Sequence, residues 1–168
     1  MVATTLAETA SLWAIRISMI LMVIVLGAEL RGAKSTGIVI AQLWCLGALF
    51  ALAHSVGAML TFHHGSQEAA LESTARQTEL LLGMRIGTGL YVNYLFVIVW
   101  LADAALRLLV QNRYSKFPIS YRYWVLGFLI FIAINGAIVF QSGSTRYVGI
   151  ACLAILGTLV LLRDRKSS

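Results

Sequence analysis

The feature that most constrains this chain is a series of five apolar runs, each close to the length needed to cross a lipid bilayer. A helix rises 1.5 Å per residue, so about twenty apolar residues cross a hydrocarbon core of roughly 30 Å. We therefore predict an all-α integral membrane bundle with five transmembrane helices. Their expected limits are residues 12–30, 37–62, 85–110, 123–140 and 147–162.

Composition supports the same class. Hydrophobic residues make up 60% of the 168 residues and charged residues only 12%, whereas soluble domains have roughly half and a quarter. No proline-rich or glycine- and serine-rich linker divides the chain, which predicts a single transmembrane domain over residues 1–168.

One longer hydrophilic segment, residues 63–82, separates the second and third spans. Ser66 is a suitable N-cap, and apolar or small residues recur at helical spacing after it. We expect a short external amphipathic helix over residues 66–82, either separate or continuous with the third span. The residues expected on its packed face are Leu71, Ala75, Thr78 and Leu82.

The positive charges predict the orientation, because lysine and arginine collect in cytoplasmic connections. With five spans, one set of connections contains Arg31, Lys34, Arg107, Arg113, Lys116, Arg122, Arg163, Arg165 and Lys166. The opposite set contains Arg76, Arg85 and Arg146. We therefore expect the N-terminus outside, the C-terminus in the cytoplasm and the segment 63–82 outside.

A cleaved signal peptide ending near Ala28 is an alternative account of the first span, and cleavage would leave four spans. Such a peptide needs a basic leading region, yet no basic residue precedes Arg16.

The net charge is +6. The basic residues lie beside apolar runs, where they can contact anionic lipid headgroups. The expected partner is the bilayer, and nucleic acid is not expected.

Polar side chains within spans are costly and therefore indicate candidate sites. With the orientation above, several of them lie at similar depth in the outer half of the membrane. They predict a polar outer-leaflet pocket centred on His54, which could bind a metal or exchange a proton with a quinone. The expected cofactor-binding residues are His54, Arg85, Tyr91, Asn93 and Asn135.

A metal site is a second hypothesis for the same region. If one helix continued through residue 64, His64, Glu68 and Glu72 would share a face, and imidazole with carboxylates suits copper, zinc or iron. A new helix starting at Ser66 would break this alignment. The candidate metal ligands are His54, His63, His64, Glu68 and Glu72.

Haem is a further alternative. Haem held by two histidines usually takes them from two facing helices, but all three histidines here lie on one span or at its end. Haem would then need a second ligand, such as Met59, Met84 or Tyr91, or a partner subunit.

Charged residues near the inner boundary receive a structural interpretation. Asp103 and Arg107 have the i, i+4 spacing of a helix-surface ion pair, and Glu29 lies close to Arg31. None of them is the midplane carboxylate expected of a proton-coupled transporter.

These observations favour a small polytopic membrane subunit that binds a metal ion, haem or quinone around His54. The alternative is a non-catalytic accessory or scaffold subunit, associated with other membrane subunits or with a second copy of the chain. A small-solute transporter is a third hypothesis, and the sequence predicts no specific enzymatic reaction.

Overall fold

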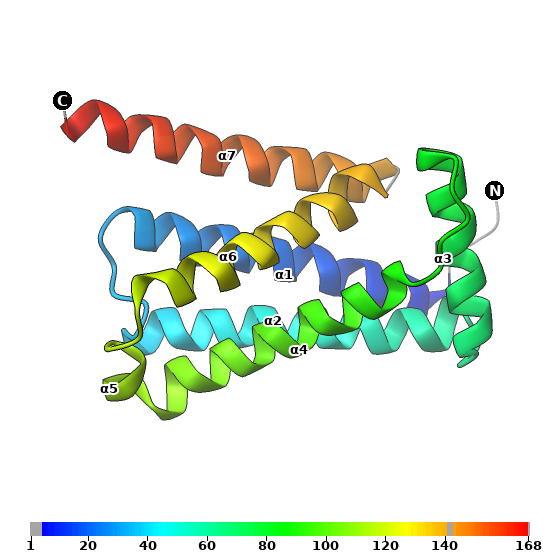
Figure 1. Cartoon of the computed structure of the whole chain (residues 1–168), viewed down its shortest axis with the longest axis horizontal. Coiled ribbons are helices and arrows are strands. Elements are labelled where there is room, and N and C mark those ends of the chain that lie inside the picture. Colours follow the sequence, from blue (N-terminus) through cyan, green and yellow to red (C-terminus); the bar gives the residue numbers. More distant parts are fainter. Residues whose placement is uncertain (1–4, 141–142, 168) are drawn as a thin grey trace.

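The protein consists of seven α-helices and one π-helical segment in the computed structural model, which describes residues 5–140 and 143–167. Five spans in this part of the chain are long and apolar enough to cross a membrane (Figure 1). The predicted all-α membrane fold is thereby confirmed. The spans are α1 (Leu6–Leu30), α2 (Ile38–Phe62), α4 (Gly89–Leu109), α6 (Ile119–Ile134) continued by η1 (Asn135–Val139), and α7 (Gly143–Ser167). The shorter helices are α3 (Gln67–Leu82) and α5 (Gln111–Tyr114).

Local capping signals shift several helix ends from their expected positions. The first helix begins at Leu6 because Thr5 and Glu8 form a reciprocal capping box. Gly83 adopts a left-handed conformation (φ 71°) that ends α3, and residues 84–88 are not helical. Consequently α3 is a separate helix and the third span begins at Gly89, four residues later than predicted. Pro118 is the N-cap of α6, where its missing N–H removes no hydrogen bond of the helix.

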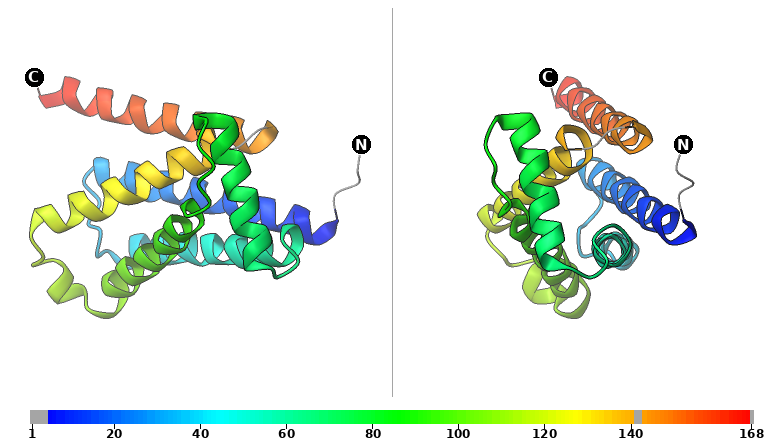
Figure 2. Two further views of the ribbon diagram at one scale, coloured as in Figure 1. Left: turned by 45° about the vertical axis from the view of Figure 1, so that its right-hand side comes forward. Right: turned by 90° about the vertical axis from the view of Figure 1, so that its right-hand side faces the viewer.

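Successive spans run in alternating directions, so their connections collect at two opposite ends of the bundle (Figure 1). One end, called the α3 end, has the start of α1 and the α2–α4 connection. The other, the α5 end, has the α1–α2 link and the α4–α6 connection. Figure 2 shows α3 lying across its end of the bundle. Residues 141 and 142, part of the turn expected before the last span, lie outside the described residues.

The apolar core joins α1, α2, α4 and α6 around two tryptophans. The ring centroids of Trp44 and Trp100 lie 5.1 Å apart, and both side chains are buried. Gly47 on α2 allows the Trp100 ring to pack against that helix, because a Cβ at Gly47 would lie 2.9 Å from the ring. Ser18 on α1 donates a 2.8 Å hydrogen bond to the Gly47 carbonyl. The absence of a side chain at Gly47 therefore brings three helices together.

A buried ionic network holds the α5 end together. Arg107 is 0% exposed and donates to Asp103 at 2.8 Å and to Glu29 at 2.6 Å. Its guanidinium lies over the Trp44 ring, 4.4 Å from the centroid. Arg122 donates to the other Glu29 oxygen at 3.2 Å. The two cations and two carboxylates balance in formal charge.

Asp103 is the acceptor shared by this network. It is 1% exposed and accepts hydrogen bonds from Trp44 Nε1 (2.8 Å), Tyr114 (2.9 Å) and Tyr121 (3.2 Å) as well as from Arg107. The predicted pair between Asp103 and Arg107 is confirmed, but both side chains are buried within a larger network. The i, i+4 spacing identified the pair, but the side chains that bury it come from α1, α2, α5 and α6. Burial also raises the pKa of the Tyr114 hydroxyl above its ordinary value, which keeps it a donor.

Replacing Arg107 with Met should lower the free energy of unfolding by about 3–5 kcal/mol, because two buried carboxylates lose their main cation. Reversible unfolding in mixed detergent and SDS micelles measures this change. Arg113→Met, at an exposed position on neighbouring α5, is the matched control and should change the value by less than about 0.5 kcal/mol. An equally small loss for both variants would show that the network does not stabilise the fold.

Candidate functional site

A cavity of about 430 Å³ lies toward the α3 end of the bundle. Residues of α1, α2, α4, α6 and η1 line its sides. Residues of α3 line it at the end of the bundle, and α3 is called the roof helix below. Most lining side chains are apolar, with a few polar groups among them. This combination is characteristic of sites for small organic molecules.

His54 on α2 lines the cavity, and its orientation is set by Ser11 on α1. The His54 Nδ1 atom lies 2.9 Å from the Ser11 carbonyl oxygen. The Ser11 hydroxyl oxygen lies slightly further from Nδ1, at 3.2 Å. Because the nearer group is a carbonyl, which can only accept, we assign the proton to Nδ1 and leave Nε2 as an acceptor. The Ser11 hydroxyl donates to the His54 carbonyl at 3.3 Å. Within the described residues Nε2 has no hydrogen-bond partner, which leaves it free for a ligand.

Gly57 makes this contact between α1 and α2 possible. A Cβ at Gly57 would lie 3.1 Å from both the Cβ and the Oγ of Ser11. A side chain at residue 57 would therefore press on Ser11 and displace it by a few tenths of an ångström. The position of the imidazole therefore depends on a small residue one turn further along α2.

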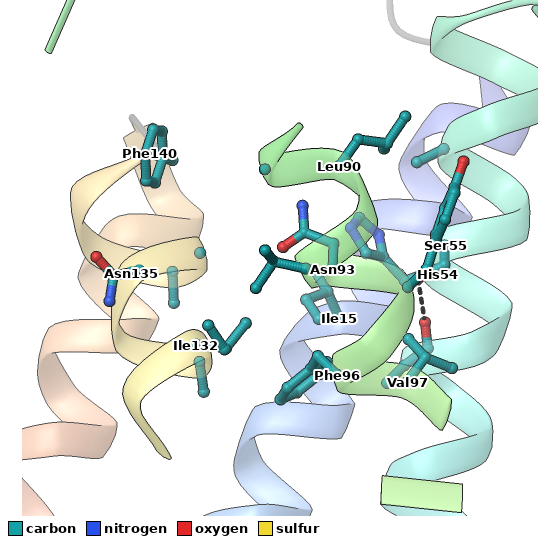
Figure 3. A pocket seen from close by; sticks show the side chains of 18 of the residues that line it. Ile15, His54, Ser55, Leu90, Asn93, Phe96, Val97, Ile132, Asn135 and Phe140 are labelled. Carbon is teal, nitrogen blue, oxygen red and sulfur yellow. Dashed lines mark hydrogen bonds between the residues drawn. The ribbon is translucent and has the colours of Figure 1, made fainter. Parts of the chain in front are cut away.

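Asn93 and Asn135 lie on opposite walls but differ in orientation (Figure 3). Figure 3 shows the Asn93 amide pointing from α4 toward η1. The Asn135 amide is turned away from α4 and donates to the Phe131 carbonyl of its own helix at 2.8 Å. Asn93 can thus offer a donor and an acceptor to a ligand, whereas the side-chain donor of Asn135 is already used.

Trp100 is a lining residue that the sequence did not single out. Its side chain is 1% exposed, yet Nε1 has no hydrogen-bond partner among the described residues. A buried donor without an acceptor is unusual. A tryptophan near the middle of an apolar span gives no sequence signal of a site, and only the three-dimensional arrangement brings Trp100 to the cavity.

The roof helix α3 is attached to the start of α4 by close packing and by ion pairs. A Cβ at Gly87 would lie 2.6 Å from the Leu71 carbonyl oxygen, so the segment before α4 fits against α3 only with glycine there. Arg85 pairs with Glu72 and, at 3.0 Å, with Glu79. Ser73, Thr74, Gln77 and Thr78 bring the inner face of α3 to the cavity.

The structure gathers some of the predicted site residues and separates others. His54, His63, Asn93 and Asn135 line the cavity, whereas Arg85 and Tyr91 do not. Arg85 belongs to the non-helical segment and faces the acidic side of α3. The Tyr91 side chain is 52% exposed on the outside of α4.

The predicted metal ligands are also divided. The second span ends at Phe62, His64 has a positive φ of 51°, and α3 starts after its N-cap Ser66. This break removes the expected alignment of His64 with Glu68 and Glu72, none of which lines the cavity. Across residues 5–140 and the described part of α7, no three histidine, cysteine or acidic side chains are grouped as metal ligands.

Comparison of the chain with protein-family models, with curated proteins and with solved structures gave no match. The geometry of the cavity is therefore the basis for a functional proposal.

Replacing Arg85 with Gln should raise the pKa of the Glu72 carboxyl. Hydrogen bonding from Arg76, together with the charge and hydrogen bond of Arg85, holds this pKa below its ordinary value. A lowered pKa means that the pairing stabilises α3 above the ordinary carboxyl range and is lost as the pH falls through the lowered value. Carboxyl ¹³C NMR titration measures the pKa, and amide protection of residues 84–88 reports on roof attachment.

Arg76→Gln is the matched control. It should also raise the Glu72 pKa, but Arg76 lies on α3 itself, so protection of residues 84–88 should remain unchanged. Equal loss of protection in both variants would contradict attachment of the roof through Arg85.

Proposed function

We propose that this protein is a small membrane subunit that binds a quinone-type ring in the cavity, in its reduced, hydroxyl-bearing form. The observation that carries the proposal is the free Nε2 acceptor of His54 in a mostly apolar cavity. A ring hydroxyl would donate to Nε2, while the apolar walls enclose the ring faces. Asn93 is placed to bind a second ring oxygen.

The tautomer of His54 supports the reduced form specifically. A quinone carbonyl needs a donor, but the Nδ1–H of the neutral imidazole is already bonded to Ser11. A quinol hydroxyl supplies its own proton and matches an acceptor. At Nε2, His54 therefore favours a ring hydroxyl over a ring carbonyl, and the amide of Asn93 can either donate to the second ring oxygen or accept from it.

A second candidate is a copper(I) or haem iron site in the same cavity. Met19, Met22 and Met59 line it together with His54 and His63, and thioether sulfur with imidazole suits copper(I) or a histidine–methionine haem. The further alternative, an accessory subunit of a membrane complex, is supported by the Ser11–His54 bond, which is also an ordinary interhelical contact.

His54→Phe should weaken binding of a tail-free methylated benzoquinol by about tenfold, the equivalent of one lost hydrogen bond. The increase in the thermal unfolding midpoint with quinol concentration gives the affinity in detergent. His64→Phe is the matched control, because His64 is exposed and lies outside the cavity.

Two results would contradict the quinol proposal. Equal quinol affinity of wild type and His54→Phe would remove His54 from the site and favour the accessory-subunit alternative. A haem absorption band or near-stoichiometric copper that disappears in Met59→Leu would favour the metal candidate.

The proposed orientation places the α3 end outside and the α5 end in the cytoplasm, on the charge distribution of the connections. A cysteine at Glu68, in a variant lacking Cys45 and Cys152, should react with an impermeant maleimide in intact cells. A cysteine at Lys116, equally exposed at the α5 end, should react only after permeabilisation. The reverse pattern would invert the orientation.

A further inference from the structure

We infer that the cavity opens sideways into the bilayer, between α4 and α6 with η1, and that its ligand has a long apolar tail that leaves through this mouth. The inference rests on the proposed function, because it assigns the tail of the same ring ligand. It narrows the ligand class to a lipid-soluble quinol with a prenyl or alkyl chain.

The mouth is defined by residues that line the cavity and are also exposed on the outside of the bundle. Val92 on α4 is 40% exposed and Phe131 on α6 is 63% exposed, and both line the cavity. Asn93 and Gly136 share these two properties, and so does Gln77 on α3. Four of these five residues lie on α4, α6 or η1, so we place the mouth between these helices.

This opening lies within the height of the membrane spans. Phe131 lies eight residues before the end of its span at Val139, which corresponds to about 12 Å along the helix. Val92 lies three residues after the start of α4, or about 4.5 Å. Leu95, Ile98 and Val139 nearby are exposed apolar side chains. A ligand passing here would therefore leave through the side of the bundle, at the height of the spans.

The local structure of η1 provides room for the tail. Gly136 is in the π-helical turn, where one extra residue per turn is accommodated. A Cβ built at Gly136 meets no atom within 4 Å. At the α3 end, by contrast, side chains of α3 line the cavity, and Figure 2 shows this helix lying across the end of the bundle.

The polarity gradient across the cavity suits an amphiphile in this orientation. His54 lies on α2, on the wall away from the mouth, with its imidazole directed toward α4 (Figure 3). Phe131 and Val92 at the mouth are apolar, and Asn93 beside them would bind the second ring oxygen. A ring held between Nε2 and Asn93 would thus direct a substituent next to that oxygen toward the bilayer.

Gly136→Leu tests the mouth without disturbing neighbouring atoms. In lipid nanodiscs it should weaken binding of a decyl-tailed quinol by about tenfold, because the leucine occupies the space of the tail, and leave the affinity of the tail-free quinol unchanged. Gly127→Leu is the matched control, since Gly127 is on α6, also has no atom within 4 Å of a built Cβ, and does not line the cavity. It should leave both affinities unchanged.

The experiment distinguishes failure of the proposed mouth from failure of the proposed function. If the tail-free quinol binds in a His54-dependent way but Gly136→Leu binds the tailed quinol like wild type, the mouth is wrong and the proposed function stands. Equal weakening of both ligands would also overturn the mouth, because the leucine would then be intruding on the ring. If wild type binds neither quinol, the proposed function fails, and the assigned tail with it.

A photoreactive group at the end of the decyl tail gives an independent measurement in wild type. We expect crosslinks in peptides containing Val92 or Phe131 and on the lipids next to them. Crosslinks concentrated on α3 would overturn the inference, because they would place the tail under the roof.

Discussion

The buried guanidinium of Arg107 imposes the arrangement of the α5 end. A charge enclosed among helices is tolerated only where opposite charges and acceptors surround it, and its partners Glu29 and Asp103 come from α1 and α4. Trp44 covers its face from α2. Among the described residues, the α3 end has no buried network of this kind: its ion pairs of Arg85 with Glu72 and Glu79 are exposed, and it also depends on neutral contacts such as Ser11 with His54. The cavity occurs at this less constrained end.

The membrane spans could be predicted from the sequence because the thickness of the hydrocarbon core imposes their length, whatever they pack against. Their ends were less accurate, because single residues decide them. The capping box at Thr5 lengthens α1, and Gly83 detaches α3 from the third span. The π-helical turn in η1 left no recognisable signal, since its sequence NGAIV is compatible with an ordinary helix.

The candidate site was predictable only in part. His54 and Asn93 could be found because polar groups within spans are costly and therefore conspicuous. Arg85 was assigned to the cavity because the third span was expected to start there, whereas the chain is not helical at that point. The burial of Arg107 was missed for a different reason: spacing along one helix shows its partner Asp103, but not the groups contributed by other helices.

The α5 end is held by a buried ionic network and α3 by exposed ion pairs, and this difference affects which part of the protein opens first. Local opening requires least free energy where backbone segments are held by exposed ion pairs and few buried contacts, which describes the attachment of α3 through Arg85. We therefore expect α3 to separate from α4 more readily than the five spans separate from one another. Such a separation would give water a route to His54.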